Sequence, residues 1–308
     1  MPLNDLSKIG KDAMSAPFPT DWKKYINDVL IKSYFDQPNV ARKLATKVIP
    51  LEFDGRYEAE IPLENDLDDA EIGMEPGIAD TELEGDLVTI PTPQIFQTMS
   101  LSEDKWAQMF AGKDRASLVM GRMPVKIKNK EDIYVFRGKT GISTGLIAQS
   151  TDLGNPAGAW GIQTNGKCTH FHTDIAKILA LLDANGIPSE WPVDVVLTSY
   201  AYTVINATMY DYNPEISNRM VAEKRLRGGR IMQSDNIQAS VLTTANTMFA
   251  SVRAPYESAG WALLASGFDI KRQDTLWGHR IGIRQKVGAK VTNANLCYYM
   301  DGISNATS

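Results

Sequence analysis

The spacing of apolar positions near the start of the chain predicts a helix followed by extended chain. Residues 1–19 are rich in small and polar residues, as in a flexible arm. Thr20 can cap a helix over residues 20–34, because apolar side chains recur after it at helical spacing. These side chains are Trp22, Tyr25, Ile26, Val29 and Leu30. Residues 40–51 are predicted to be extended and to lead into a hairpin.

Alternation with a period of two begins after residue 56. Tyr57, Ala59, Ile61 and Leu63 interleave with glutamates and a proline, which predicts a half-amphipathic strand. Residues 87–99 predict the returning strand. Pro residues at 91 and 93 confine that strand to a sheet edge, because proline has no backbone N–H to donate.

The middle of the chain shows helical spacing again. Ser100 and Glu103 have capping-box spacing, which predicts a short helix over residues 100–110. Residues 115–135 predict a longer helix that Pro124 should kink or interrupt. Residues 137–166 hold seven glycines and are predicted to be a loop.

The second half predicts short helices and strands in mixed order. Thr173 can cap a helix over residues 174–185, with Gly186 at its C-terminal cap. Two further helices are expected, and Pro214 begins the second of them. The expected helices cover residues 200–210 and 214–226, and the expected strands cover 193–198, 230–232, 240–244, 261–265, 268–271, 280–291 and 296–299. The fold class is therefore α+β with segregated elements, and no internal repeat is present.

The composition is that of an ordinary globular protein. Of 308 residues, 43% are apolar and 22% are charged, and no apolar run is long enough to span a membrane. The N-terminus has no signal-peptide pattern, and Cys168 and Cys297 are too few for a disulfide framework. We therefore expect an intracellular product in a reducing compartment. Because the first nineteen residues contain only Lys8 and Lys11, no Arg-rich arm for nucleic acid is expected.

The charge is distributed unevenly along the chain. Residues 52–86 hold fourteen Asp or Glu residues, a single Arg at position 56 and no Lys. This segment has a formal charge of −13, so the remainder of a chain with net charge −5 carries +8. An acidic hairpin of this kind repels itself and cannot bury much apolar surface internally. It needs a surface outside itself, and another copy of the same chain is the simplest supplier.

Two passages resemble a known superfamily. The first is Glu131-Asp-Ile-Tyr-Val-Phe-Arg-Gly138, followed by the glycines at 141 and 145. The second is Lys224-Arg-Leu-Arg-Gly-Gly-Arg-Ile231. They are similar to the signature after the spine helix, and to the glycine-glycine strand, of Hong Kong 97-type capsid proteins. That superfamily includes the major capsid proteins of tailed viruses and the shell proteins of encapsulin compartments.

The resemblance implies a fold and a division of the chain. Residues 1–50 would form an N-terminal arm with a helix, and residues 51–98 the extended acidic loop. Residues 99–150 and 268–308 would form a peripheral domain with the spine helix and the C-terminal strands. Residues 151–267 would form an axial domain.

The function implied is that of a structural protein and not of an enzyme. The chain would be the major capsid protein of a tailed virus, forming pentamers and hexamers of an icosahedral shell around double-stranded DNA. DNA would be contacted without sequence readout, and portal, scaffold or decoration proteins are possible partners. The location would be the virion capsid, assembled in the host cytoplasm, with no membrane partner and no cofactor. The alternative is an encapsulin-type shell that holds an enzyme cargo.

Residues of the loop, the arm and the Arg-rich turn are the expected contacts between subunits. They are Glu58, Glu60, Asp66, Asp68, Asp69, Glu71, Glu82, Glu84, Asp86, Trp22, Arg225, Arg227 and Arg230. Some members of the superfamily link subunits covalently through a lysine of the extended loop. Here no lysine occurs between Lys47 and Lys105, so we expect non-covalent cohesion.

A metal hydrolase is a third class that the sequence raises. Cys168, His170 and His172 would share one face of a strand, and the pattern H-x-H-x-D is that of metallo-β-lactamase-like enzymes. That family needs a histidine directly after the aspartate, where Ile175 stands, and further histidines where only His279 exists. We therefore favour the interpretation that this segment simply leads into a helix, without a metal. Similarly, the Arg227-Gly-Gly-Arg230 segment is interpreted as a helix cap and a tight turn.

Overall fold

Ten segments of the chain are described by the computed structural model. They are residues 39–45, 47–62, 87–102, 113–160, 169–206, 218–238, 246–253, 260–267, 269–275 and 278–303. The predicted helix at 20–34, the strand at 240–244 and most of the acidic loop lie outside these residues.

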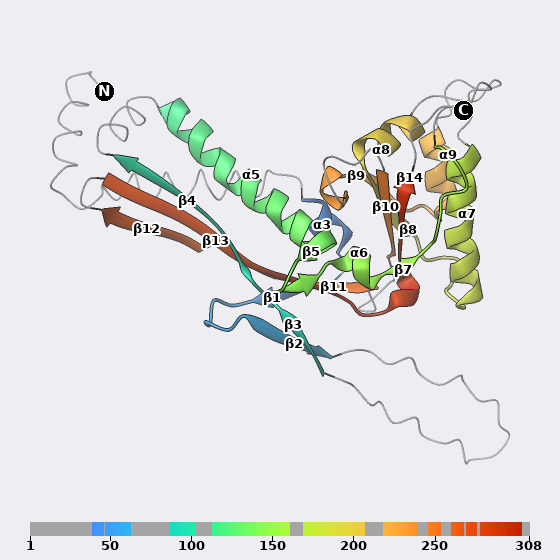
Figure 1. Ribbon diagram of the computed structural model, residues 1–308, viewed down its shortest axis with the longest axis horizontal. Helices are drawn as coiled ribbons and strands as arrows, with labels where there is room; N and C mark the ends of the chain where they lie inside the picture. Colours follow the sequence, from blue (N-terminus) through green and yellow to red (C-terminus); the bar gives the residue numbers. More distant parts are fainter. Residues whose placement is uncertain are drawn as a thin grey trace, which may run out of the picture.

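The first sheet is built around one long strand, β13 (Gly278–Val291). The last residues of β13 pair with β11 (Trp261–Ser266), which pairs in parallel with β1 (Lys47–Leu51). The earlier residues of β13 pair on one side with β12 (Asp269–Thr275) and on the other with β4 (Gln94–Ser102). Helix α5 (Lys113–Arg137) lies along this sheet (Figure 1).

The second sheet has the order β7-β14-β10-β8-β9. Its central strands, β10 (Asn246–Val252) and β8 (Val193–Leu197), are buried at every position. The outer strands are β7 (Thr151–Asp152), β14 (Cys297–Ile303) and β9 (Ile231–Gln233). Helices α7 (Thr169–Ala184), α8 (Ser199–Asn206) and α9 (Asn218–Arg225) pack around it (Figure 1).

Short elements join these parts. They are α3 (Val40–Leu44), β2 (Glu58–Pro62), β3 (Leu87–Pro91), β5 (Gly138–Lys139), β6 (Ser143–Thr144), α6 (Leu146–Gln149), η1 (Asp235–Ile237) and η2 (Ala294–Leu296). One apolar core connects the end of α5 to both sheets, and its Phe136 and Phe249 rings meet edge to face at 5.4 Å. The two sheets are not built from separate stretches of the chain, since β11 lies in the first sheet and β14, which follows it in sequence, lies in the second.

Many of the predicted elements are confirmed. The helix expected at 115–135 is α5, and it runs through Pro124 without a break, held by packing against the first sheet. Helix α7 ends in a Schellman motif: Gly186 has φ 69°, and Ile187 N donates to Leu182 O at 3.0 Å. Within the described residues, no helix has the length and apolar content needed to cross a membrane.

Two predictions near the N-terminal end of the described chain are wrong. Residues 40–44 form helix α3 and not extended chain, because the Asn39 side chain accepts a hydrogen bond from Arg42 N. The strand expected at 87–99 is two strands that separate at Thr92, whose backbone N donates to Tyr57 O at 2.6 Å.

Other differences arise where pairing partners override local signals. Residues 100–102 extend β4, because they pair with residues 278–280 of β13, so no helix begins at Ser100. Helix α7 begins at Thr169, which places Thr173 inside it and not at its cap. The segment expected as a loop from 137 contains β5, β6, α6 and β7. Strand β10 was not predicted, because buried polar residues interrupt its apolar pattern.

Candidate functional site

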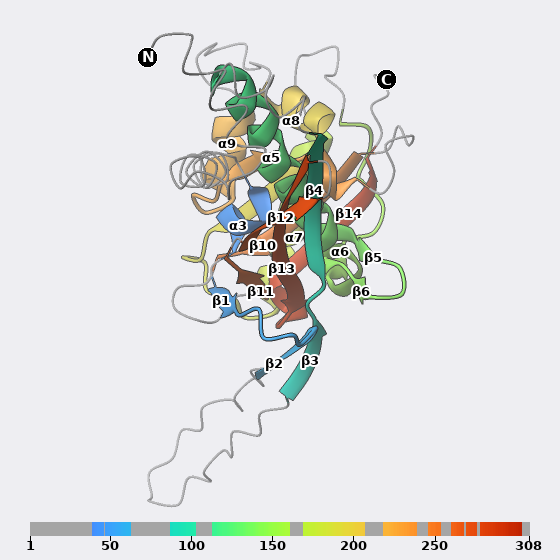
Figure 2. The same cartoon turned by 90° about the vertical axis from the view of Figure 1, so that its left-hand side faces the viewer.

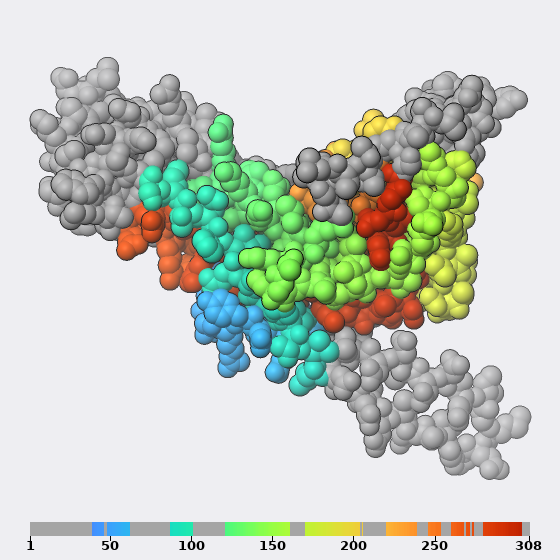
Figure 3. All heavy atoms as spheres, viewed as in Figure 1, coloured from blue at the N-terminus to red at the C-terminus, as the bar shows by residue number. Residues whose placement is uncertain are grey.

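The root of the acidic loop is a two-stranded hairpin that is anchored on the first sheet. Strands β2 and β3 pair antiparallel from Glu58 opposite Pro91 to Pro62 opposite Leu87. Ile61 and Ile90 are buried together with Ala262 and Leu264 of β11. The hairpin projects from the body in both ribbon views, and appears as a blue and cyan protrusion in Figure 3 (Figures 1–3). The packing of this root on the sheet therefore holds its two ends, Pro62 and Leu87, in place.

The other face of the hairpin is exposed and acidic. Glu58 and Glu60 are both exposed, and an open pocket of about 750 Å³ lies beside them, lined also by Glu52 and Asp54. Large apolar side chains flank this face, since Tyr57 is 61% and Leu87 68% exposed. A surface that combines carboxylates with exposed apolar groups is suited to a complementary protein surface.

A buried ammonium group fixes the turn that precedes the hairpin. Lys286 of β13 is 2% exposed. Its Nζ donates to Glu52 O at 2.8 Å and to Asp54 Oδ1 at 2.7 Å. The hydrogen bond from Lys286 lowers the pKa of Asp54 below its ordinary value. Beside it, the Arg284 guanidinium lies 4.5 Å from the centre of the Phe53 ring. These contacts hold the direction in which the hairpin leaves the sheet.

The arm is anchored by a second cluster of buried charges, on α5. Asp132 is 3% exposed, and its carboxylate accepts hydrogen bonds from Ala41 N at 3.0 Å and Val40 N at 3.3 Å, at the start of α3. Arg42 Nε donates to the fully buried Glu131 at 2.7 Å. Burial raises the pKa of Asp132 to about 6, against the effect of its backbone hydrogen bonds. The same burial lowers the pKa of Lys128.

The predicted contact residue Arg230 has partners within its own chain. Its guanidinium donates to the buried Asp194 at 2.7 Å and to Lys43 O, at the end of α3, at 3.0 Å. Arg253 also lies 3.4 Å from Asp194. Arg230 therefore ties the arm to the second sheet. Its side chain is still 46% exposed.

Arg227 forms the cap and tight turn that the sequence predicted. It has φ 60°, a left-handed conformation that is uncommon for a residue with a side chain. Gly228 N donates to Glu223 O at 3.0 Å, which closes α9. The Arg227 guanidinium donates to Asp183 and to Pro188 O, so it joins α9 to the end of α7. Arg225, by contrast, is exposed.

The predicted placement of the histidines is wrong. His170 and His172 lie on helix α7 and not on a strand. Residues two apart on a helix point in different directions, so they do not share a face. Asp174 is fully buried and accepts hydrogen bonds from Ala157 N and Trp160 Nε1. No cluster of three metal-ligating side chains occurs among the residues that the structure describes, and Cys168 lies outside them.

Several predicted contact residues lie outside the described residues. They are Trp22, Asp66, Asp68, Asp69, Glu71, Glu82, Glu84 and Asp86. The sequence reasoning missed Lys286, Asp54, Asp132 and Asp194 as positioning residues. Asp132 lies inside the motif that carried the resemblance, and this was a usable signal. No sequence signal marked Lys286 as buried. It lies two residues after Arg284 on the same strand, so alternation places both side chains on one side of the sheet, although Arg284 is more exposed.

Comparison with known proteins agrees with the topology. No family model matches the chain, and no curated protein matches it in sequence. Among solved structures, a virus-like particle from Pyrococcus furiosus aligns with a TM-score of 0.61 at 10% identity, over 91% of this chain and 100% of that chain.

The capsid of a phage and the capsid of a GTA particle also align with the chain. The capsid of Myoviridae phage XM1 gives a TM-score of 0.59 at 11% identity, over 82% of this chain and 89% of that chain. The capsid of an empty GTA particle gives a TM-score of 0.57 at 15% identity, over 85% of this chain and 89% of that chain. These alignments cover most of the chain, so they concern its overall fold. The chain has the Hong Kong 97-type capsid fold.

Proposed function

We propose that the chain is a shell subunit, the major capsid protein of a tailed virus with a double-stranded DNA genome. The observation that carries the proposal is the anchored hairpin on this fold. Its inner face is buried on the subunit's own sheet through Ile61 and Ile90. Its outer face presents Glu58 and Glu60, and the ten carboxylates of residues 63–86 have no basic residue among them to offset their charge. The remainder of the chain, which is positively charged, offers the complement on neighbouring copies.

Assembly into rings follows from this asymmetry. A contact that closes a ring needs two different complementary surfaces on each subunit, and an acidic hairpin with a basic body provides them. Exposed ion pairs contribute only about 0–1 kcal/mol each. The charges therefore set the register, while apolar groups such as Tyr57 and Leu87 supply cohesion. Pentamers and hexamers of one chain would form the shell, located in the virion and assembled in the host cytoplasm.

The predicted contacts retain distinct roles in this proposal. Glu58, Glu60 and the acidic residues of 63–86 face a neighbouring subunit, and Trp22 belongs to the arm. Arg225 contacts a neighbour directly. Arg227 and Arg230 act mainly by holding the turn after α9 in place, because both already have partners within the chain. Packaged DNA is contacted without sequence readout, and portal, scaffold and decoration proteins are further partners.

Expression of the protein alone tests the proposal. Purified protein should form closed particles that negative-stain microscopy resolves as icosahedral shells. A monomer that persists at high concentration would contradict the shell function. Treatment with nuclease and analysis of particle contents from the native source would then show protected double-stranded DNA.

A second candidate is a compartment shell that holds an enzyme. It is supported by the alignment with the Pyrococcus furiosus virus-like particle, a shell that is not described as the capsid of a virus. Neighbouring genes separate the two: terminase, portal and protease genes support the virus, and a peroxidase or ferritin-like gene supports the compartment. A stoichiometric pair of zinc ions in the purified protein would instead indicate the hydrolase class.

The subunits are expected to cohere without covalent links. The loop has no lysine between positions 47 and 105 to form an isopeptide bond. Assembled particles boiled in denaturant should therefore give a single band at the mass of one chain. Ladders of higher mass that survive reduction would contradict this prediction.

A further inference from the structure

The exposed side of helix α5 carries three basic residues in a row. Arg122, Lys126 and Lys130 are all exposed, and they follow one another at intervals of four residues. Because four residues advance a helix by about 6 Å and turn it slightly more than once, these side chains lie along one side of α5 over about 12 Å. Glu131 and Asp132 follow on the helix, but both are buried and hold α3. Their carboxylates are therefore not at the surface to offset these three cations, which we call the basic row.

The basic row has no partner within the part of the chain that the structure describes. Its three side chains form neither an ion pair nor a hydrogen bond there. Other arginines of the body do have carboxylate partners, such as Arg42 with Glu131 and Arg230 with Asp194. The positive charge of the row is therefore available to a group outside the chain.

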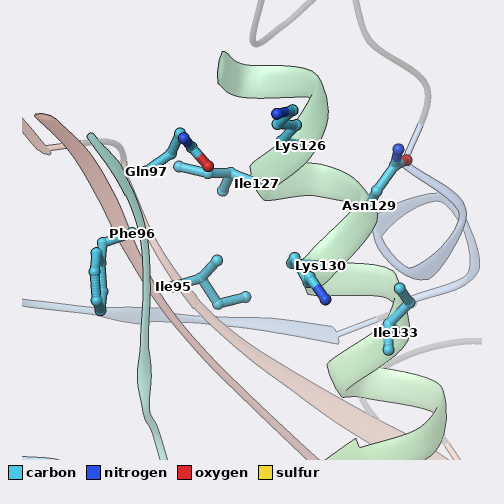
Figure 4. Close-up of a pocket in the computed structure, with 8 residues that line it drawn as sticks. All are labelled: Ile95, Phe96, Gln97, Lys126, Ile127, Asn129, Lys130 and Ile133. Atoms are coloured by element: carbon cyan, nitrogen blue, oxygen red, sulfur yellow. The ribbon is translucent and has the colours of Figure 1, made fainter. Parts of the chain in front are cut away.

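A groove of about 420 Å³ lies beside the basic row, between α5 and strand β4. Ile95 and Gln97 of β4 point toward the helix, and Lys126 and Lys130 border the groove on α5 (Figure 4). The polar residues of the lining are Gln97, Asn129 and the two lysines, so the lining contains no carboxylate. Lysine, asparagine and glutamine side chains donate hydrogen bonds to phosphate oxygens in protein–DNA complexes. This lining therefore suits an anion that presents acceptor oxygens.

A fourth cation lies on the helix that flanks α5. Lys43 of α3 is exposed, and α3 lies next to Asn129 of α5 (Figure 4). The acidic hairpin of a neighbouring copy would bring the two exposed glutamates of β2, Glu58 and Glu60, to this surface. An extended polyanion supplies a charge for every cation, because duplex DNA carries one phosphate charge per about 1.7 Å of its axis. Over the length of the basic row this amounts to about seven charges.

We propose that the basic row contacts the phosphate backbone of packaged double-stranded DNA, and that this side of α5 faces the interior of the shell. The inference rests on the proposed function, which leaves open the face of the subunit that meets the genome. Contacts with phosphates carry no sequence information, as is expected of a shell that encloses a whole genome. The attraction comes from the release of counterions, so it weakens as the salt concentration rises.

Binding of a short fluorescein-labelled DNA duplex to the full chain tests the proposal. The protein is kept unassembled, below the concentration at which particles form, and fluorescence anisotropy is measured from about 50 to 200 mM salt. The row variant carries Arg122→Gln, Lys126→Gln and Lys130→Gln. The control variant removes the same charge at three exposed positions outside α5 and the groove, by Lys139→Gln, Lys271→Gln and Arg280→Gln.

The logarithm of the binding constant should fall linearly with the logarithm of the salt concentration in the wild type. In the row variant this slope should be less steep by about 2–3, from about 0.9 for each phosphate contact that is lost. In the control variant the slope should stay at the wild-type value. Equal slopes in the two variants, or no binding by the wild type, would overturn the proposal.

Assembly is measured separately, by negative-stain microscopy without DNA. Both variants should form particles as the wild type does, and closed wild-type particles should not bind duplex added from outside. The proposal is overturned if the row variant binds DNA normally but no longer assembles, since the row is then a contact between subunits. It is also overturned if closed particles bind the duplex as well as free subunits do. A wild type that binds DNA through the row but forms no particles would contradict the shell function, while DNA binding by the row stands.

Discussion

Two buried charged residues hold the segments that leave the body of the molecule. Lys286 fixes the turn before the acidic hairpin, and Asp132 caps the helix that ends the arm. Both side chains are almost fully buried. Lys286 donates hydrogen bonds to Glu52 O and to Asp54, and Asp132 accepts hydrogen bonds from the backbone N–H groups of Val40 and Ala41. Removing one partner of such a pair leaves the other without compensation in a low-dielectric site.

Replacing Lys286 by Met should loosen the hairpin. The aliphatic part of the side chain is kept, while Glu52 O and Asp54 lose their shared donor. We expect the free energy of unfolding to fall by about 1–3 kcal/mol, and amide exchange in residues 52–62 to accelerate. Lys290→Met on the same strand is the control. Unchanged exchange in residues 52–62 would show that Lys286 does not fix the turn.

Asp132 should make stability depend on pH near 5. Its ordinary pKa is 3.8, and in the folded protein it is about 6. Between these values the folded state binds a proton that the unfolded state has released, so stability decreases as pH rises from about 4 to 6. The change is at most about 3 kcal/mol, from 1.36 kcal/mol per pKa unit. Glu131, Lys128 and Arg42 face the same site and will modulate it.

Denaturant unfolding at several pH values measures this dependence. Asp132→Asn should remove most of the slope between pH 4 and 6, because the amide does not titrate. Asp152→Asn, at an exposed carboxylate, is the matched control. Equal slopes in the wild type and Asp132→Asn would contradict the assignment.

At the level of elements, close backbone contacts fix the conformation of the turn between helix α9 and strand β9, residues 226–230. A Cβ atom on Gly229 would lie 1.8 Å from Val193 O, and the clash is with backbone that cannot move aside easily. The neighbouring residues are already constrained, since Arg227 is left-handed and Gly228 closes the helix. This turn sets the parallel pairing of β9 with β8, from Ile231 opposite Val195.

Gly229→Ala should therefore destabilise the second sheet. We expect a loss of about 1–3 kcal/mol, typical of overpacking in a tight site. Gly267→Ala is the matched control, because nothing lies within 4 Å of its added Cβ and its φ is not in the left-handed region. Thermal unfolding of both variants measures the difference. Equal melting temperatures would show that the turn can relax.

The sequence located many of these elements but not all of their ends. Helix α5 and strand β13 were found because their patterns are long. Strand β10 was missed because Asn246, Thr247 and Ser251 are buried through hydrogen bonds and pairing that only the folded sheet provides. The start of α3 depends on Asp132, which lies 91 residues away from Ala41 in the chain. Local patterns carry no information on such partners.

For the whole molecule, the charge is distributed unequally, and in the proposed shell this asymmetry orients neighbouring subunits. The acidic outer face of the hairpin is held away from the body, so its carboxylates are available to a neighbour. Charges on such a rim affect association rate and register more than final affinity. The fold leaves this face open while it buries the opposite one on β11.

Reversing two charges tests this effect. Glu58→Lys combined with Glu60→Lys should leave the subunit folded but slow assembly by about tenfold at low salt. The difference should shrink at high salt, where screening is strong. Glu190→Lys, an exposed site remote from the hairpin, is the control. Light scattering during assembly measures the rates, and identical rates for all three proteins would refute a steering role.

The sequence by itself determined the α+β class, the long helix α5, the uneven charge and the presence of an acidic hairpin. These follow from periodicity and composition, which are local properties of the chain. Only the tertiary structure decided that Lys286 and Asp132 are buried, that His170 and His172 lie on a helix, and that β11 and β14 belong to different sheets. Those outcomes depend on partners far apart in sequence, since burial and strand pairing are set by the whole chain at once.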